Sequence, residues 1–154
     1  MTTRGECLCG AVRFEVDCFV GPFELCHCSR CRKAFGAAFA PMIGVERADF
    51  RWLAGEDRIR SYEAPVRVHP PGYRTAFCAT CGSTVPDVPA DAGWFEVPAG
   101  LLDADFDASP DRHIYVDHAP DWHPIEDDRP RLTERELIRL RLGKLAPPQD
   151  DPVE

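Results

Sequence analysis

The N-terminal part of the chain alternates apolar and polar side chains along residues 11–18, "AVRFEVDC". Val12, Phe14, Val16 and Cys18 stand at every second position, and charged residues separate them. A period of two is typical of a β-strand that buries one of its faces. We therefore expect Cys18 to lie in the core, where a free cysteine behaves as a small apolar residue.

Short strand-like segments of the same kind follow at close intervals. The expected strands cover residues 23–28, 38–45, 50–55, 59–64, 73–78, 94–100 and 112–118. Pro and Gly punctuate most of the gaps, and "GEDR" and "PPGY" are expected to form turns between neighbouring strands. A single short helical turn is expected at 29–36, with Gly36 at its end. The pattern predicts a mainly β fold.

The C-terminal part has a helical pattern instead. Thr133 precedes Glu136 by three residues, which is the spacing of a capping box, and Gly143 is a natural end for the helix. The apolar stripe of this short amphipathic helix consists of Leu137, Ile138, Leu140 and Leu142. The helix can pack on the domain or on a second subunit, so a homodimer is a candidate assembly.

The length of 154 residues suits one domain with a single core. We expect a β domain over residues 1–125 and a C-terminal extension over 126–146 that carries the helix. The tail, 147–154, is rich in Pro and acidic residues and is predicted to be disordered.

Charge and hydropathy exclude several classes of protein. The net charge of −8 argues against nucleic-acid binding, which normally requires a basic face. The longest apolar run falls short of the roughly 18 residues that a membrane helix needs. The N-terminus lacks the basic start and apolar stretch of a signal peptide. We therefore predict a cytoplasmic protein that binds neither membrane nor nucleic acid.

The cysteines carry the chemistry. In a chain without an export signal, clustered cysteines are more often metal ligands or redox groups than disulfides. Cys78 and Cys81 have the spacing of a zinc knuckle, and Cys7 and Cys9 point the same way on an extended chain. Together these four thiolates can close a tetrahedral structural zinc site. The alternative is two unrelated pairs of free thiols.

The segment "CHCSRC" supplies a second set, Cys26, Cys28 and Cys31, which is left without a fourth cysteine. Three protein ligands and one open position are the arrangement of a catalytic zinc. His27, between two of the ligands, is expected to point away from the metal. The alternative is a dithiol redox pair formed by Cys28 and Cys31.

The motifs "GECLCGAVRFEV", "CHCSRCRKAFG", "YRTAFCATCGSTV", "VPAGLLD" and "HIYVDHAPDW" resemble the glutathione-dependent formaldehyde-activating enzymes, or CENP-V/GFA domain. The resemblance covers about residues 4–122 and implies an Mss4-like zinc-binding β fold. It implies two zinc ions per chain, a structural ion at Cys7, Cys9, Cys78 and Cys81 and an exchangeable catalytic ion at Cys26, Cys28 and Cys31. One departure is Phe35, which stands where family members often carry a small hydroxyl residue.

The expected activity is that of a carbon–sulfur lyase similar to S-hydroxymethylglutathione synthase. The enzyme would add a small thiol such as glutathione to formaldehyde or another small carbonyl, or would catalyse the reverse reaction. Arg30, Arg32 and Lys33 are candidates to bind the carboxylates of the thiol, or else form a solvated basic face. The candidate proton donors are His113, His118 and Asp103, and Trp94 and Trp122 are candidates to line the pocket. The competing functions are a non-catalytic zinc-binding interaction module and a thiol redox enzyme.

Overall fold

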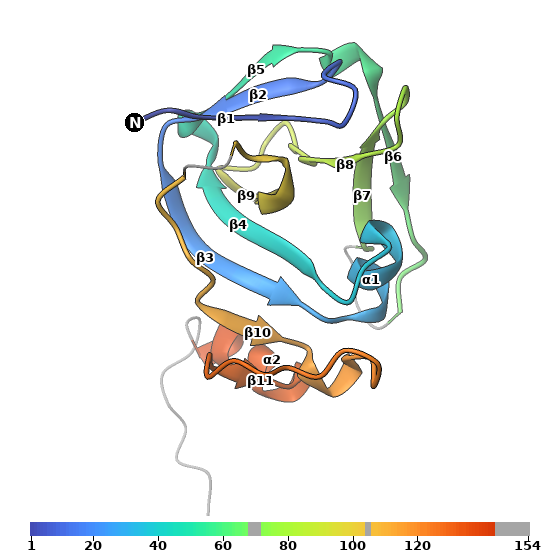
Figure 1. The fold of residues 1–154 in the computed structure, drawn as a ribbon, viewed down its shortest axis with the longest axis vertical. Helices are drawn as coiled ribbons and strands as arrows, with labels where there is room; N and C mark the ends of the chain where they lie inside the picture. Colours follow the sequence, from blue (N-terminus) through green and yellow to red (C-terminus); the bar gives the residue numbers. More distant parts are fainter. Residues whose placement is uncertain (68–71, 104–105, 144–154) are drawn as a thin grey trace, which may run out of the picture.

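The computed structural model describes residues 1–67, 72–103 and 106–143. Within these ranges eleven strands form three sheets, and two α-helices accompany them (Figure 1). The predicted mainly β fold with a short C-terminal helix is confirmed. The predicted tail at 147–154 lies outside the described residues, and the domain division near residue 125 stays a prediction.

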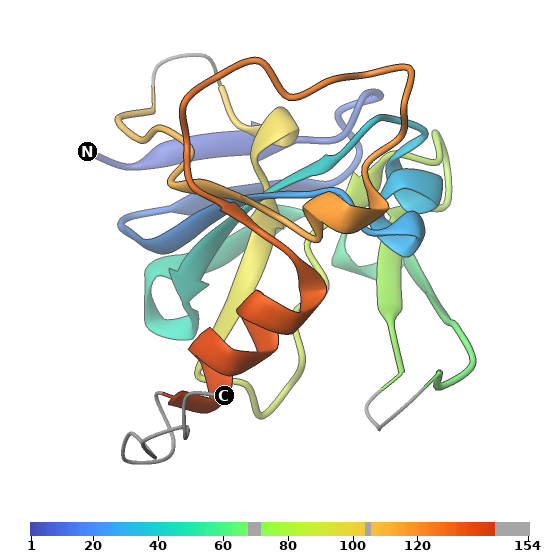
Figure 2. The same ribbon diagram turned by 90° about the horizontal axis from the view of Figure 1, so that it is seen from below.

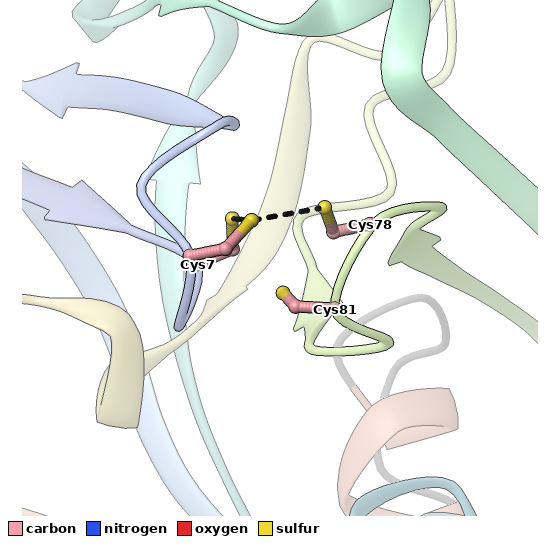
Figure 3. Close-up of side chains that lie close together, drawn as sticks. Cys7, Cys78 and Cys81 are labelled. Atoms are coloured by element: carbon pink, nitrogen blue, oxygen red, sulfur yellow. Dashed lines mark hydrogen bonds between the residues drawn. The ribbon is translucent and has the colours of Figure 1, made fainter.

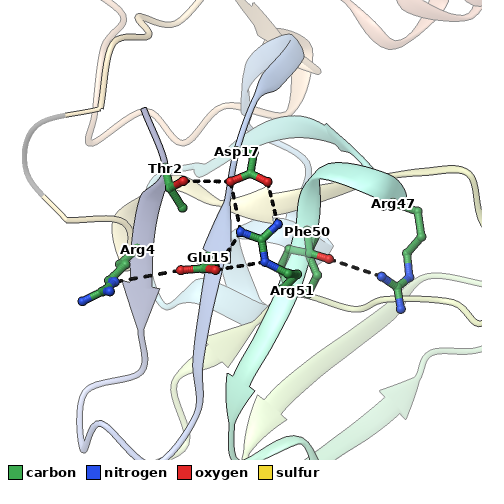
Figure 4. Close-up of polar contacts among 7 residues, drawn as sticks. All are labelled: Thr2, Arg4, Glu15, Asp17, Arg47, Phe50 and Arg51. Carbon is green, nitrogen blue, oxygen red and sulfur yellow. Dashed lines mark hydrogen bonds and ion pairs between the residues drawn. The ribbon is translucent and has the colours of Figure 1, made fainter.

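The first sheet is antiparallel and joins β1 (Thr3–Glu6), β2 (Arg13–Val16) and β5 (Phe50–Ala54) in that order. On its exposed face the guanidinium of Arg51 lies 2.7 Å from the Glu15 carboxylate and 2.5 Å from that of Asp17 (Figure 4). These cross-strand ion pairs lie between the two strands whose other face supplies Phe14 and Phe50 to the core.

The prediction that Cys18 is a core residue is wrong. Phe14 and Val16 are buried as expected, but β2 ends at Val16 and the thiol of Cys18 is exposed. The N–H of Asp17 donates to the carbonyl of Asp49, and the chain then bends into the next strand, which begins at Phe19. The period of two therefore stops before Cys18, although the sequence pattern continues through it.

The second sheet has five strands in the order β11–β10–β3–β4–β9. Their bounds are β3 (Phe19–Cys26), β4 (Ala40–Glu46), β9 (Trp94–Pro98), β10 (Arg112–Ile114) and β11 (Arg131–Leu132). The strand β10 runs parallel to both β3 and β11, whereas β3, β4 and β9 are antiparallel. One face of this sheet packs on the first sheet and forms the main core, which includes Phe23, Leu25, Ile43, Val45, Phe95 and Val97.

The third sheet is a smaller antiparallel unit of β6 (Ile59–Glu63), β7 (Arg74–Cys78) and β8 (Thr84–Val85). The short helix α1 (Ser29–Phe35) follows β3 and ends, as predicted, at Gly36, whose positive φ of 60° favours glycine. Short 3₁₀ turns occupy several connections: η1 (Arg47–Asp49), η2 (Glu56–Arg58), η3 (Ala99–Leu101) and η4 (Val116–His118).

Two local predictions require correction. The strand expected over 112–118 ends at Ile114, because Tyr115 adopts a left-handed conformation with φ of 57° and the 3₁₀ turn η4 follows. The "GEDR" turn does not connect paired strands, since β5 and β6 belong to different sheets. The strands β1, β8 and β11 were not predicted, because each is short and lacks a clear apolar alternation.

The C-terminal helix α2 (Glu134–Gly143) begins with the predicted capping box. The N–H and hydroxyl of Thr133 each donate to the Glu136 carboxylate at 2.8 Å, and the N–H of Glu136 returns a bond to the Thr133 hydroxyl. Figure 2, seen from below, shows α2 in front of the strands. None of the helices in the described ranges has the length and apolarity needed to cross a membrane.

The predicted apolar stripe of α2 is buried at only one of its four positions. Leu137 is fully buried and packs with Cys26, Cys31 and Ile114, whereas the other three side chains are 37–58% exposed. A single leucine therefore anchors the helix against the five-stranded sheet.

We expect Leu137→Ala to lower the free energy of unfolding by about 2–4 kcal/mol, because it leaves a cavity between α2 and the sheet. Ile138→Ala, next to it but 46% exposed, is the matched control and should cost less than about 1 kcal/mol. Equilibrium denaturation measures both, and equal losses would contradict the anchoring role.

Candidate metal centres and active-site cavity

The first cysteine cluster joins two segments that lie 69 residues apart in the sequence. The sulfur atoms of Cys7, Cys9, Cys78 and Cys81 all lie within 4.8 Å of one another. The Sγ atoms of Cys7 and Cys9 are 3.6 Å apart, and those of Cys9 and Cys78 are 3.9 Å apart. Figure 3 shows Cys7, Cys78 and Cys81 pointing toward one another. Four sulfur donors at this spacing fit a tetrahedral metal ion.

The backbone around this cluster is arranged to support thiolates. The N–H of Val12 donates to the Cys7 sulfur at 3.3 Å. Gly82, with φ of 79°, makes the turn after Cys81 and donates its N–H to the carbonyl of Cys78. Hydrogen bonds from the Ser83 hydroxyl and backbone lower the pKa of Cys81 to about 6. At Cys81 the deprotonated form that a metal requires is thus favoured.

The second cluster consists of Cys26, Cys28 and Cys31, whose sulfur atoms also lie within 4.8 Å of one another. Cys26 ends β3, Cys28 caps the N-terminus of α1, and Cys31 lies in the first turn of that helix. The N–H of Cys31 donates to the Cys28 sulfur at 3.3 Å. Among the described residues, no fourth Cys, His, Asp or Glu joins this group.

The three thiols bind protons very unequally. Hydrogen bonds from the Cys26 and Cys31 thiols, supported by backbone N–H groups at the start of α1, hold the pKa of Cys28 far below its ordinary value. The same contacts, together with burial, raise the pKa of Cys26 well above its ordinary value. Three sulfur donors this close together suit a soft cation.

His27 takes no part in the sulfur cluster. Its ring is fully buried, and Nε2 lies 2.8 Å from Nδ1 of His113. The Nε2 atom of His113 donates in turn to the Asp127 carboxylate, 3.1 Å away, because a carboxylate can only accept. In the neutral ring of His113, Nδ1 is then the acceptor for the Nε2–H of His27. Burial, followed by the effect of His113, lowers the pKa of His27 to about 4, so its ring is neutral at pH 7.

A cavity of about 720 Å³ opens beside the three-cysteine cluster. Cys26, Cys28 and Cys31 form part of its wall, and Phe35 and Tyr73 lie next to them. The cavity continues over the face of the five-stranded sheet that points away from the main core, and α2 closes one side. The four-cysteine cluster does not line it, so the two cysteine groups differ in their access to a ligand.

The other residues singled out from the sequence fall into two groups. Arg30, Trp94 and His118 line the cavity. The remaining ones do not line it. Arg32 donates to the backbone carbonyl of His27, and His113 is buried against the same histidine. The side chains of Lys33 and Asp103 are exposed, and that of Trp122 is 71% exposed.

Several cavity residues were not anticipated from the sequence. Tyr73, Tyr115, Arg67, Glu24, Glu96 and Arg141 all line the cavity. Burial, with a further contribution from Cys31, raises the pKa of the Tyr73 hydroxyl. The one available signal was the strand alternation of 23–26 and 94–98, which places Glu24 and Glu96 opposite the core face. Nothing local to the sequence places α2 at the cavity.

The chain belongs to the family of glutathione-dependent formaldehyde-activating enzymes. The family model of that description matches residues 2–118. A Halomonas elongata protein named "Putative glutathione-dependent formaldehyde-activating enzyme" is 35% identical over 133 residues, which are 82% of each chain. A crystal structure of a Rhodobacter sphaeroides protein shares the fold, with a TM-score of 0.50 and 23% identity over 68% of this chain and 91% of that one.

We expect His113→Leu to destabilise the protein by about 1–3 kcal/mol, because it leaves the buried Nε2–H of His27 without an acceptor. His123→Leu is the control, since His123 is exposed. Urea denaturation of both variants at pH 7 makes the comparison. A His113 variant as stable as the His123 variant would show that the buried hydrogen bond contributes nothing.

Proposed function

We propose that this protein is a zinc-dependent carbon–sulfur lyase that adds a glutathione-like thiol to formaldehyde or another small carbonyl, and catalyses the reverse reaction. The observation that carries the proposal is the three-sulfur cluster in the cavity wall. It has no fourth Cys, His, Asp or Glu partner in the described part of the chain. Membership of the family supports the same chemistry.

The donor sets suit the proposed metal. Cys7, Cys9, Cys78 and Cys81 would hold a structural zinc ion, and Cys26, Cys28 and Cys31 would hold a catalytic one. Thiolate ligands favour zinc over the harder cations magnesium and calcium. A zinc ion at the second site would supply the Lewis acidity that keeps a thiol deprotonated and nucleophilic at neutral pH.

The residues of the cavity would perform the remaining tasks. The thiol sulfur attacks the carbonyl carbon, a C–S bond forms, and the π bond opens to an alkoxide that takes up a proton. The hydroxyl of Tyr73 lies beside the cysteines and stays protonated, because burial raises its pKa. It is therefore suited to donate a hydrogen bond to the oxygen on which charge develops.

Positive charge near the cysteines would bind a carboxylate of the thiol. Arg30 and Arg67 line the cavity at the start of α1, where the Arg67 guanidinium lies 3.4 Å from the Ser29 hydroxyl. Of the basic residues predicted from "CHCSRCRK", Arg30 is the one in the cavity wall. We propose that it makes this contact, whereas Arg32 and Lys33 act at longer range.

Phe35 gives the cavity an apolar wall next to Cys31. Family members often carry a hydroxyl residue at this position, whereas the Phe35 side chain offers no hydrogen bond to a small hydrated aldehyde. We therefore propose that aldehydes with a short apolar substituent are accepted alongside formaldehyde.

The purified chain is expected to contain two zinc ions, and elemental analysis would count them. Cys28→Ser should lose about one ion and stay folded, because its cluster lies at the cavity wall. Cys78→Ser should lose one ion and become less stable, since a structural zinc contributes several kcal/mol to folding. Cys18→Ser, which changes an exposed thiol outside both clusters, is the control. Two ions in all variants would contradict the ligand assignment.

Enzyme-dependent adduct formation is the direct test of the proposed function. NMR should show faster formation of S-hydroxymethylglutathione from glutathione and formaldehyde with the protein than without it. Cys28→Ser should return the rate to the uncatalysed level, and Tyr73→Phe should lower it by about tenfold to a hundredfold. Cys18→Ser should match the wild type. Identical rates with and without protein would overturn the proposal, and a reversible Cys28–Cys31 disulfide would favour the redox alternative.

A further inference from the structure

The cavity extends past the cysteines to a part that the function proposed above does not use. Its floor is the outer face of the five-stranded sheet, where Glu24, Met42 and Glu96 lie on three adjacent strands. The helix α2 closes it and contributes Arg141. The residues of α2 lie beyond the segment 2–118 that the family model matches.

Arg141 presents a guanidinium to this end of the cavity. Its Nη2 lies 3.1 Å from Oε2 of Glu24, and the other carboxylate oxygen of Glu24 binds Arg112 at 2.6 Å. Glu24 is 1% exposed, and each of its carboxylate oxygens is bound by one of these two arginines. The side chain of Arg141 is 55% exposed, and its other N–H groups make no hydrogen bond within the described ranges. Arg141 is thus oriented by Glu24 and still free to bind an anion.

Glu96 supplies the opposite charge. It lies on β9 and makes no ion pair or side-chain hydrogen bond to any described residue. Burial raises its pKa, and the nearby Glu24 adds to this effect while Arg141 opposes it. A carboxylate that is largely shielded from water and has no partner is costly, and a bound cation would remove that cost.

We propose that Arg141 and Glu96 bind an α-amino-acid zwitterion carried by the thiol substrate, the guanidinium taking its carboxylate and the Glu96 carboxylate its ammonium group. This rests on the function proposed above and assigns the residues that would recognise its thiol. The two residues determine specificity and do not touch the reacting atoms.

The charges of Arg141, Glu24 and Glu96 favour a zwitterion over either ion alone. A lone ammonium group at Glu96 would be repelled by Arg141, and a lone carboxylate at Arg141 would be repelled by Glu24 and Glu96. A group with both charges on one carbon satisfies the free guanidinium and the unpaired carboxylate together, with charge-assisted hydrogen bonds.

The distance from the cysteines requires a spacer between the thiol and the zwitterion. Cys26 pairs with Ala40 and Glu96 with Gly44, so Glu96 is offset from Cys26 by four residues, or about 13 Å along β4. Glu96 and Cys26 also lie on the two strands that flank β4, about 10 Å apart. Glu24, which holds Arg141, lies between them in register, two residues from Cys26. Free cysteine is too short to span this distance, whereas a γ-glutamyl thiol carries its zwitterion several bonds from the sulfur.

Calorimetric binding of three thioethers to the full zinc-loaded chain tests the proposal. The probes are S-methylglutathione, its glutaryl analogue, which lacks the ammonium group, and its 4-aminobutyryl analogue, which lacks the α-carboxylate. The wild type should bind S-methylglutathione about tenfold more tightly than either analogue, since one charge-assisted contact is lost in each.

The variants assign each charge to its residue. Glu96→Gln should abolish the preference over the glutaryl analogue and keep the preference over the 4-aminobutyryl analogue. Arg141→Met should do the reverse. Glu46→Gln and Arg139→Met are the controls, because both residues are exposed and lie outside the cavity wall. Since Glu96→Gln is nearly isosteric, its result stands even if Arg141→Met loosens α2.

Equal binding of the three thioethers by the wild type would overturn the proposal, as would a Glu96→Gln variant that still discriminates against the glutaryl analogue. If adduct formation nevertheless depends on the enzyme, the proposed function survives and only the zwitterion site is lost. Absence of both binding and adduct formation would overturn the two together.

Discussion

The alternation of side chains along β3 links the hydrophobic core to the cavity. Phe23 and Leu25 point into the main core, whereas Glu24 and Cys26 point to the opposite face. The register of β3 with β4 and β10 places these residues beside Met42 and Ile114. A shift of one residue would exchange the two faces, bury a carboxylate among phenylalanines and remove one sulfur from the cluster. Packing of the core therefore positions the metal-ligating face.

Burial of Glu24 makes the same strand depend on the C-terminal extension. An isolated buried carboxylate is strongly unfavourable, and here Arg112 from β10 and Arg141 from α2 compensate it. Leu137 adds the apolar contact that holds α2 in place, within the same cluster as Cys26 and Cys31. The helix thus stabilises the cavity and shapes one of its walls, although it lies outside the segment that the family model matches.

Features with a local cause were predictable. The spacing of the cysteines, the glycine that ends α1 and the capping box of α2 each depend on a few adjacent residues, and the structure contains all three arrangements. Predictions that extended a periodic pattern past its end failed. Cys18 follows a bend, and the strand at 112 stops at the left-handed Tyr115, because long-range packing and not the pattern determines where each strand ends.

The sequence alone determined the local cysteine groups, the two pairs and the triplet, because ligand spacing within a turn is a local property. The two pairs lie 69 residues apart, and the tertiary structure brings them together. The sequence also determined the fold class, since alternating short segments can only bury their apolar faces as sheets. Only the tertiary structure decided which cluster meets a cavity and which residues face it. Glu24, Glu96 and Arg141 come from three elements far apart in the chain, and strand register and helix docking bring them together. Such contacts depend on the packing of the whole domain, which no short segment encodes.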